Sequence, residues 1–437
     1  MSFFLKGVKL PHRKNTACCE AVSLPPVTSV TIPTSMHIGV PAKPIVKKGD
    51  PVYVGTLIAE ANGAVSSPVH SSVSGTVTAI SEVLLANGST CEGIVIESDG
   101  QMTIDPSITP PTFSTKDELI DALFQSGIVG LGGAGFPTSV KFKTDKTIEE
   151  LVINGAECEP YITSDNDTML NKADLMAAAI KTLVKFFDIK KVIIGIEKNK
   201  PKAIANMKKM AQDLENVEIK ALPSIYPQGG EKVLIYHTTG KVVKEGGLPI
   251  DVGCVVCNCS TIAEIGKFLK TGVPLVDRTL TVDGDAIEKP QNIVAPIGTP
   301  IKDVLDFCGT KAEVKKVLYG GPMMGVCADS LESPVLKQTN ALLAFNKKDA
   351  APKKITNCIR CGGCTNTCPF GLAPLDIATA YEKKDMEELD RLKVNLCMEC
   401  GCCGYICPAF RPLVQQNKLA KAALAEWKKE QKAKLKH

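Results

Sequence analysis

The sequence predicts a multidomain protein in which a β module, an α/β core, a second β-rich module and a helical cysteine-rich domain follow one another. Three observations predict this order. Short alternating strands come first, strands and helices alternate in the middle, and eight of the 18 cysteines form two repeats near the end. We therefore expect domains at residues 1–110, 111–245, 246–335 and 336–437.

The composition is that of an ordinary globular chain, and we expect it to stay in the cytoplasm. Of its 437 residues 44% are hydrophobic, and the net charge of +4 is too small to indicate a nucleic-acid partner. No apolar run approaches the roughly 20 residues of a membrane span, and the N-terminus lacks the apolar core of a secretory signal. In a reducing compartment, the 18 cysteines indicate metal ligation rather than disulfides.

The first module is predicted from two stretches that read as related hairpins, VKKGDPVYVGTLIAEANG and AVSSPVHSSVSGTVTAI. Each alternates β-branched and small residues between turn signals, which predicts a small β-sandwich. This resembles the barrel-sandwich shape of biotinyl and lipoyl carrier domains. Those carriers place a lysine at the hairpin tip, where this chain reads SSPVHSSVSG, so we expect no modified lysine but a structural module that docks onto other chains.

The α/β core begins after the proline-rich linker DPSITPPTFST, with a capping box at Thr115–Glu118 that opens a helix. The strands EELVING, KKVIIGIE and VEIKALP alternate with helical segments, which predicts a parallel sheet. In residues 246–329 the predicted elements become shorter and are mostly strands, with one helix. This module is similar to a soluble-ligand-binding β-grasp domain. The basic tail KLAKAALAEWKKEQKAKLKH predicts an amphipathic helix, either solvated or docked on anionic lipid or an acidic partner.

The two cysteine repeats, CIRCGGCTNTCP and CMECGCCGYICP, both fit the run C-x₂-C-x₂-C-x₃-C-P of two-cluster ferredoxins. In that run three cysteines ligate one [4Fe–4S] cluster and the fourth ligates the other. Structural zinc is the alternative, but zinc commonly uses two C-x₂-C pairs separated by a longer loop. Cys402 lies out of phase with the spacing and is expected to be a bystander. The predicted ligand sets are Cys358, Cys361, Cys364 and Cys407 for cluster one, and Cys397, Cys400, Cys403 and Cys368 for cluster two.

The glycine-rich stretch GIVGLGGAGFPTSVKF is the second candidate site. Gly130, Gly132 and Gly135 match G-x-G-x-x-G, but a helix precedes them, so the context is not that of the usual dinucleotide fingerprint. Successive glycine N–H groups can bind an anion while a flat ring lies on the bare backbone; a structural turn is the alternative. Asn154 and the two glutamates of NGAECEP follow a strand, where ligands of α/β sheets bind.

These loops resemble those of the flavin- and NADH-binding subunit of respiratory complex I and of NAD-reducing hydrogenases. That family carries an RGGAGFPTGLKW-like loop, a DESEP-like turn, a GEE-type helix start and an NNVET-like turn. Here GLGGAGFPTSVKF, NGAECEP, GGE and VVCNCSTI correspond to them. The chain departs from this pattern at Leu131, Ala156, Cys158 and Cys257, and Gly230 stands where the first acid of the GEE element falls.

The order of domains is similar to that of the C subunit of the Rnf electron-transport complex, over essentially the whole chain. The resemblance implies two [4Fe–4S] clusters, non-covalent FMN and NAD(H) as substrate. It places Phe136 and Glu159 at the nicotinamide dinucleotide and Lys141 at the flavin phosphate, and it requires no catalytic acid or base. The remaining flavin residues that it implies are Gly132, Gly133, Ala134, Gly135, Asn154, Glu157, Gly230, Glu231, Asn258 and Thr261.

The same resemblance implies a peripheral subunit at the cytoplasmic face of the membrane, in a ferredoxin:NAD⁺ oxidoreductase that translocates Na⁺ or H⁺. Its partners would be other Rnf subunits, including a ferredoxin-like iron–sulfur subunit and integral membrane subunits. Two alternatives stay open. One is a soluble flavin and iron–sulfur carrier that serves another reductase with electrons from NADH, and the other is a ferredoxin-relay adaptor whose nucleotide site has decayed.

Overall fold

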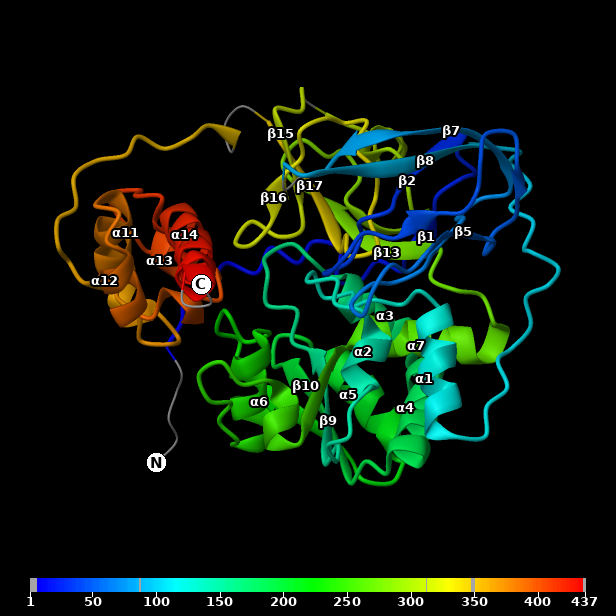
Figure 1. The fold of residues 1–437 in the computed structure, drawn as a ribbon, viewed down its shortest axis with the longest axis horizontal. Coiled ribbons are helices and arrows are strands. Elements are labelled where there is room, and N and C mark those ends of the chain that lie inside the picture. Colours follow the sequence, from blue (N-terminus) through cyan, green and yellow to red (C-terminus); the bar gives the residue numbers. More distant parts are fainter. Residues whose placement is uncertain (1–5, 86–87, 312, 347–349, 435–437) are drawn as a thin grey trace.

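The computed structural model describes residues 6–85, 88–311, 313–346 and 350–434. Figure 1 shows the α/β core below two β domains, with the helical C-terminal domain at one side. A long extended segment connects that helical domain to the second β domain. The first three domains share one large buried cluster, which includes Ile32, Leu151 and Leu280, whereas the helical domain has a core of its own.

The N-terminal domain contains two antiparallel sheets, in the strand orders β2-β8-β7-β4 and β3-β5-β6. Their apolar faces meet around Val77, Ile94 and Ile96, which are fully buried, and the domain is built of short antiparallel strands. The strands are β2 (Ser29–Pro33), β3 (Lys43–Pro44), β4 (Pro51–Val52), β5 (Leu57–Glu60), β6 (Val69–His70), β7 (Gly75–Leu84) and β8 (Thr90–Ser98).

The α/β core is built on a parallel sheet in the order β11-β10-β9-β12, which confirms the predicted class of sheet. Thr115 caps the first helix in a complete capping box, also as predicted. The strands are β9 (Glu150–Gly155), β10 (Lys191–Glu197), β11 (Val217–Leu222) and β12 (Cys254–Asn258). The helices are α1 (Lys116–Gln125), α2 (Thr138–Phe142), α3 (Ser164–Asn171), α4 (Ala173–Phe187), α5 (Pro201–Ala211), α6 (Glu231–Thr239), the 3₁₀ turn η1 (Pro249–Val252) and α7 (Cys259–Thr271).

The second β domain is a six-stranded mixed sheet in the order β1-β14-β13-β17-β15-β16. Its single helix after the core, α8 (Ile301–Cys308), buries Ile301, Val304 and Leu305. The strands are β1 (Val22–Ser23), β13 (Asp277–Asp283), β14 (Gln291–Pro296), β15 (Lys316–Tyr319), β16 (Val326–Cys327) and β17 (Ala341–Phe345).

Three strands pair with strands on the other side of a domain limit that the sequence suggested. β12 pairs with β9, so the α/β core continues past residue 245, and β17 pairs with β13 and β15, so the second sheet continues past residue 335. β1 pairs with β14, so the first module does not include the whole N-terminal segment. Each strand is short and follows an irregular stretch, and a short apolar run alone does not reveal which sheet it joins.

The C-terminal domain is helical, as predicted, and packs around Ile377, Leu389, Val394 and Leu424. None of the helices in the described ranges combines the length and the apolar run needed to cross a bilayer. Residues 418–434 of the basic tail lie in the last helix, as the predicted helix requires, and its last three residues lie outside the described residues. The elements are α10 (Gly363–Thr367), α11 (Pro374–Glu382), α12 (Met386–Arg391), the 3₁₀ turn η2 (Val394–Leu396), α13 (Cys402–Tyr405) and α14 (Leu413–Lys434).

Candidate functional site

The glycine loop between α1 and α2 closes on itself. The N–H of Gly130 donates to the carbonyl of Phe136 over 2.8 Å, and the N–H of Gly135 donates to the carbonyl of Gly130 over 3.1 Å. Gly133 has a φ of +116°, which side chains disfavour, and nothing lies within 4 Å of a Cβ placed there. Because residues 132–134 are exposed, the loop presents bare main chain to open space.

Asn258 and Thr261, at the junction of β12 and α7, contact this loop. Asn258 Oδ1 caps α7 by accepting from the N–H groups of Ser260 and Thr261, at 2.9 and 3.3 Å. Thr261 Oγ1 accepts from the N–H of Leu131 at 3.0 Å. A Cβ on Gly132 would lie 3.3 Å from Asn258 Cβ. Three residues chosen from the sequence, Gly132, Asn258 and Thr261, are therefore neighbours.

Asp165 in α3 links this junction to the acidic turn, and the sequence analysis missed it. Asn258 Nδ2 and Ser260 Oγ each donate to one carboxylate oxygen of Asp165, both at 2.7 Å. The N–H of Asp165 donates to Glu157 Oε1, also at 2.7 Å. The available signal was the acidic run SDND, which follows the acidic turn NGAECEP after three intervening residues.

Asn154, Gly230 and Glu231 gather at the carboxyl ends of the parallel strands. Asn154 Nδ2 donates to the carbonyl of Gly229 over 2.9 Å, which connects the end of β9 to the loop that precedes α6. Gly230 occupies the N-cap of α6, and Glu231 is its first residue and is exposed. Lys141 reaches the same sheet from α2, where its Nζ donates to the carbonyl of Val256 over 2.8 Å.

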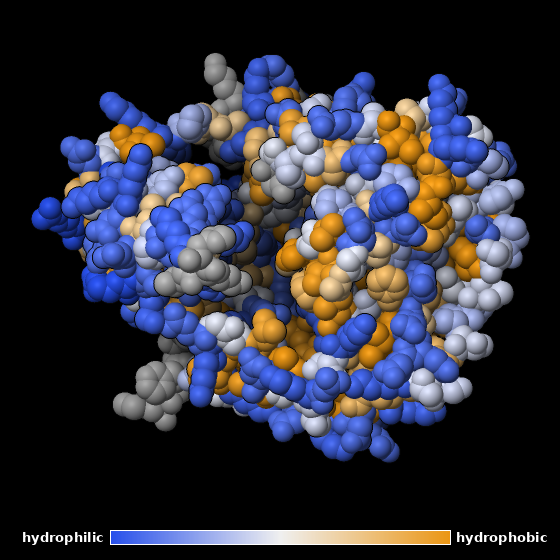
Figure 2. All heavy atoms as spheres, viewed as in Figure 1, coloured by the Kyte–Doolittle hydropathy of each residue, from blue (hydrophilic) through white to orange (hydrophobic). Residues whose placement is uncertain are grey.

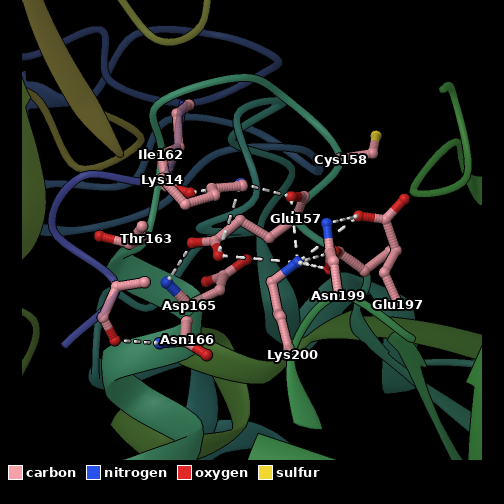
Figure 3. Close-up of polar contacts among 12 residues, drawn as sticks. Lys14, Glu157, Cys158, Ile162, Thr163, Asp165, Asn166, Glu197, Asn199 and Lys200 are labelled. Atoms are coloured by element: carbon pink, nitrogen blue, oxygen red, sulfur yellow. Dashed lines mark hydrogen bonds and ion pairs between the residues drawn. The ribbon is translucent and has the colours of Figure 1, made fainter. Parts of the chain in front are cut away.

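A buried charge cluster lies beneath the acidic turn (Figure 3). Lys14 Nζ donates to the carbonyls of Glu157, Glu159 and Ile162, at 2.8, 2.9 and 2.5 Å. Lys200 Nζ donates to the carbonyl of Glu157 at 3.3 Å. These contacts hold Glu157 at a φ of +47°, so the turn depends on a lysine from an irregular N-terminal segment.

The carboxylate of Glu157 is close to two ammonium groups but only partly satisfied. Its Oε2 lies 3.9 Å from Lys14 Nζ and 4.0 Å from Lys200 Nζ, and within the described ranges this buried oxygen accepts no hydrogen bond. Burial raises the pKa of Glu157 to about 7, although both lysines act in the opposite direction. Burial likewise lowers the pKa of Lys14 to about 8, against the attraction of Glu157. A hydroxyl donor would complete this site.

Glu159 points to the turn formed by GGPMMG, residues 320–325. Its two carboxylate oxygens accept from the N–H groups of Met323 and Met324, at 3.0 and 2.9 Å. A side chain at Gly321 would collide with the carboxylate, so this glycine permits a close approach. Met323 in turn packs beside Tyr226, Met398 and the buried cysteines of the second repeat.

The cysteines of the two repeats line two hollows in the helical domain, and each repeat contributes to both. The first hollow is lined by Cys358, Cys361, Cys364 and Cys407, and the second by Cys368, Cys397, Cys400, Cys402 and Cys403. Among the described residues, no three His, Cys, Asp or Glu side chains converge closely enough to hold one metal ion. A space lined by four thiols suits a cluster of several irons, whose ligands stand farther apart than those of a single ion.

The second hollow lies against the α/β core. Tyr226 Oη donates to the carbonyl of Cys400 over 2.6 Å, and Cys402 Sγ lies 3.8 Å from the carbonyl of Tyr226. A Cβ at Gly230 would collide with Met398 Cε. Val8 joins this cluster through a two-way main-chain pairing with Tyr226, at 2.9 and 3.0 Å. Figure 2 shows the surface hollowed where the helical domain meets the rest of the molecule.

Comparison with known protein families accounts for most of the chain. Four families match, each over its own segment. They are the RnfC barrel sandwich hybrid domain at residues 2–101, the Nuo51 FMN-binding domain at residues 123–267, the SLBB domain at residues 279–326 and the 4Fe-4S dicluster domain at residues 353–408. These domains and the two sites define a flavin and iron–sulfur oxidoreductase subunit.

The particular family follows from the full-length relatives. The chain is 43% identical over 405 residues to the C subunit of the Na⁺-translocating ferredoxin:NAD⁺ oxidoreductase complex of Acetobacterium woodii, covering 91% of this chain and 90% of the relative. It is 39% identical over 401 residues to the proton-translocating counterpart of Clostridium ljungdahlii, covering 90% and 87%. The chain belongs to the C-subunit family of ion-translocating ferredoxin:NAD⁺ oxidoreductase (Rnf) complexes.

Solved structures show a more distant likeness in fold. Two structures of an NAD⁺-reducing [NiFe]-hydrogenase, H₂-reduced and air-oxidized, align with TM-scores of 0.50 and 0.52 at 17% and 19% identity. The alignments cover 71% and 72% of this chain, and 63% and 64% of the hydrogenase chains.

Proposed function

We propose that the chain passes electrons between NAD(H) and two [4Fe–4S] clusters through non-covalently bound FMN, in a ferredoxin:NAD⁺ oxidoreductase complex that translocates Na⁺ or H⁺. One observation carries the proposal. The residues around the second hollow pack on the edge of the parallel sheet that carries Gly230. Met398 lies against Gly230, and Tyr226 donates to the carbonyl of Cys400. When bound, FMN exchanges electron pairs with nicotinamide and single electrons with iron–sulfur clusters.

The flavin site is assigned to the strand ends that face the glycine loop. The exposed main chain of residues 132–134 leaves room for a flat ring, and the N-terminus of α6 at Gly230 suits a phosphate. Glu157 Oε2, buried and without a donor in the described chain, is a suitable acceptor for a ribityl hydroxyl. The residues that would hold FMN are Gly132, Gly133, Ala134, Gly135, Lys141, Asn154, Glu157, Gly230, Glu231, Asn258 and Thr261.

Phe136 and Glu159 are assigned to the nicotinamide dinucleotide. Phe136 is half-buried beside the open face of the glycine loop, so its ring is available to a planar base. Glu159 already accepts two main-chain N–H groups from the turn at residues 320–325. We therefore assign Glu159 a positioning role, in which it holds that turn at the edge of the site.

The cluster ligands are assigned to the two hollows. The first set is Cys358, Cys361, Cys364 and Cys407, and the second set is Cys397, Cys400, Cys403 and Cys368. The lining of the two hollows supports this division, because each contains the first three motif cysteines of one repeat and the last cysteine of the other, and the second hollow contains Cys402 in addition. Cys402 lines the second hollow as well but stays outside the assigned set, since its Sγ lies toward the carbonyl of Tyr226.

The partners are assigned from the family. We place the chain at the cytoplasmic face of the membrane, as a peripheral subunit that contacts a ferredoxin-like iron–sulfur subunit and integral membrane subunits of the complex. Ion translocation belongs to those partners.

Anaerobic purification followed by metal and flavin analysis tests the proposal. We expect about eight irons and about eight sulfides per chain, and FMN released by mild denaturation. Titration with NADH, followed by absorbance and EPR, is expected to reduce the flavin and then the clusters. Zinc in place of iron, or no flavin after reconstitution, would contradict the proposal.

Two further outcomes separate the alternatives. Iron without flavin, and no response to NADH, would favour the relay adaptor. Full cofactor content without co-purification from membranes would favour the soluble carrier.

A further inference from the structure

The first cysteine set has a surface unlike the rest of the helical domain. Ile359, between Cys358 and Arg360, is 70% exposed, and Ile355 is 56% exposed. Phe410 and Tyr405, which flank the last cysteine of the set in sequence, are also about half exposed. Apolar side chains so strongly exposed and so close together usually mark a surface that binds a partner.

These apolar residues belong to one face. The N–H of Thr356 donates to the carbonyl of Ala409 over 3.0 Å, which holds the segment before Cys358 against the segment after Cys407. A Cβ on Gly363 would lie 3.7 Å from Ile406, so the loop of the first repeat also contacts this segment. Ile359 and Ala409 both line the first hollow. We call residues 353–362 and 405–411 the collar.

The collar is positively charged. Its two segments contain Lys353, Lys354, Arg360 and Arg411 but no aspartate or glutamate. Arg411 lies 3.5 Å from Glu382, outside the collar. The two lysines and Arg360 are exposed, so they project a positive field around an apolar centre.

The first set is also the more accessible of the two. Cys358 and Cys361 are exposed, whereas Cys400 is buried against the core. Redox encounters commonly use small interfaces, in which charge guides the approach and a few apolar residues make the contact. A basic rim around an apolar centre is complementary to a protein with an acidic rim.

We propose that the collar is the docking surface for a small acidic iron–sulfur protein that exchanges electrons with the cluster held by the first cysteine set. This inference rests on the proposed function of the two sets. In each encounter one electron leaves the reduced partner cluster and one enters the cluster of the first set, and no bond or proton changes. A lipid surface would match the same charge, but it would not explain why the apolar residues surround the exposed cysteines.

Charge reversal at the collar tests this proposal on the intact, cluster-loaded chain. The variant is Lys353→Glu/Lys354→Glu, outside the cysteine loops. The matched control is Lys432→Glu/Lys434→Glu, which makes the same charge change at exposed positions of α14, about 28 Å along the helix from Leu413 at 1.5 Å per residue. The probe is an acidic two-[4Fe–4S] ferredoxin, and its binding in the oxidised state is measured by calorimetry at low and high salt.

We expect the collar variant to weaken binding by about tenfold at low salt, and the difference from wild type to vanish at high salt. The control should bind like wild type. Ile359→Ser, which removes the apolar centre, should weaken binding at both salt concentrations. Reduction by dithionite and the iron content should stay unchanged in both lysine variants, so that loss of the clusters, which would contradict the proposed function, is recognised separately.

Three results would overturn the proposal. The first is equal binding by the collar variant, the control and wild type. The second is loss of sedimentation with anionic phosphatidylserine vesicles without loss of ferredoxin binding, which would make lipid the occupant. The third is a self-associated species that only the collar variant abolishes, which would make the occupant a second copy of the chain.

Discussion

The two cysteine sets share one sequence pattern but lie in opposite surroundings. In both repeats a glycine with positive φ, Gly362 or Gly401, begins a short helix between the cysteines, at φ of +73° and +86°. Around the second set the neighbouring side chains are Tyr226, which is buried, and Met398 and Met323, which are partly buried. Around the first set it is exposed, apolar and basic.

This difference teaches that the repeat determines the local fold, whereas tertiary position determines what each site can exchange electrons with. The second set faces the carboxyl-end edge of the parallel sheet, and the first faces outward. A substitution at one cysteine set can be compared with the same kind of substitution at the other set, or with a matched substitution elsewhere in the chain.

The largest expected effect comes from removing one cysteine of each set. Cys403→Ser and Cys361→Ser should each lower the iron content by about half. With the second set disrupted, reduction of the remaining cluster by NADH should slow by at least roughly 100-fold, because the proposed flavin site lies on the side of the second set. With the outward set lost, NADH should still reduce the remaining cluster. Freeze-quench EPR measures both, and equal rates would remove the distinction between the sets.

A smaller but still large effect is expected at the buried lysine beneath the acidic turn. Lys14→Met keeps the volume of the aliphatic side chain but removes three hydrogen bonds. Of the two ammonium groups near the carboxylate of Glu157, only that of Lys200 then remains. We expect a loss of about 3 kcal/mol in the free energy of unfolding, together with weaker FMN retention. Lys9→Met, at an exposed position of the same segment, is the control. Chemical denaturation and flavin release measure the two effects, and intact FMN retention would show that the nucleotide site does not depend on this N-terminal segment.

Tyr226→Phe is a smaller change, which tests the contact between the second set and the α/β core. Losing the hydrogen bond to the carbonyl of Cys400 should cost about 1–2 kcal/mol and lower the reduction potential of the second cluster by roughly 10–30 mV, since a nearby donor is removed. The first cluster should keep its potential. Tyr319→Phe is matched, because Tyr319 Oη donates to the carbonyl of Pro334 over 2.8 Å in the second β domain. EPR-monitored titration distinguishes the variants, and an equal shift in both would mean that the effect is not local.

The smallest expected effect is a pH dependence of the free energy of unfolding, confined to the first three domains, which share one buried cluster. His70 and Lys337 lie behind the glycine loop, where Lys337 Nζ donates to the carbonyls of Pro68 and Gly127, both at 2.7 Å. Burial is the largest cause that lowers the pKa of His70 to about 3, and it lowers the pKa of Lys337 to about 7. A histidine kept neutral in the folded state contributes stability that is present above its unfolded pKa of about 6.5 and is lost as the pH falls below it.

Between pH 7.5 and 5.5 this histidine should therefore cost the core about 1 kcal/mol. His70→Gln should flatten that decline, whereas replacing the exposed His12 with Gln should not. The described part of the helical domain contains no histidine, and its Trp427 is the only tryptophan of the chain, so its fluorescence reports that domain separately. A decline of the same size in tryptophan fluorescence and in circular dichroism would contradict a pH effect confined to the core.

Local patterns in the sequence predicted much of the fold. The parallel sheet, the capping box at Thr115 and the helical C-terminal domain follow from periodicity and cap chemistry over a few residues. Asn154, Asn258 and the glycine loop could be grouped because the carboxyl ends of parallel strands meet at one edge. The two iron–sulfur clusters were predicted from the cysteine spacing, and the flavin domain was identified by family resemblance.

The parts that could not be predicted are contacts between distant positions. Lys14 contacts a turn 143 residues away, and Tyr226 contacts Cys400 across 174 residues. No periodicity or spacing encodes such a contact, and a buried lysine reads in sequence like any solvated lysine. The strands at residues 254–258 and 341–345 pair across the expected domain limits for the same reason, since their partners are fixed only when the sheets assemble.

The pairing of β1 with β14 has a consequence for how the chain is made. Val22 pairs with Ile293, so the leading segment has no partner strand until about 270 further residues have been translated. At 5–20 residues per second, that wait is roughly 15 to 55 s on the ribosome. Lys14 meets its turn after about 150 residues and Val8 meets Tyr226 after about 220, so Val22 is the last of the three to reach its native neighbour and stays available to chaperones for longest during synthesis.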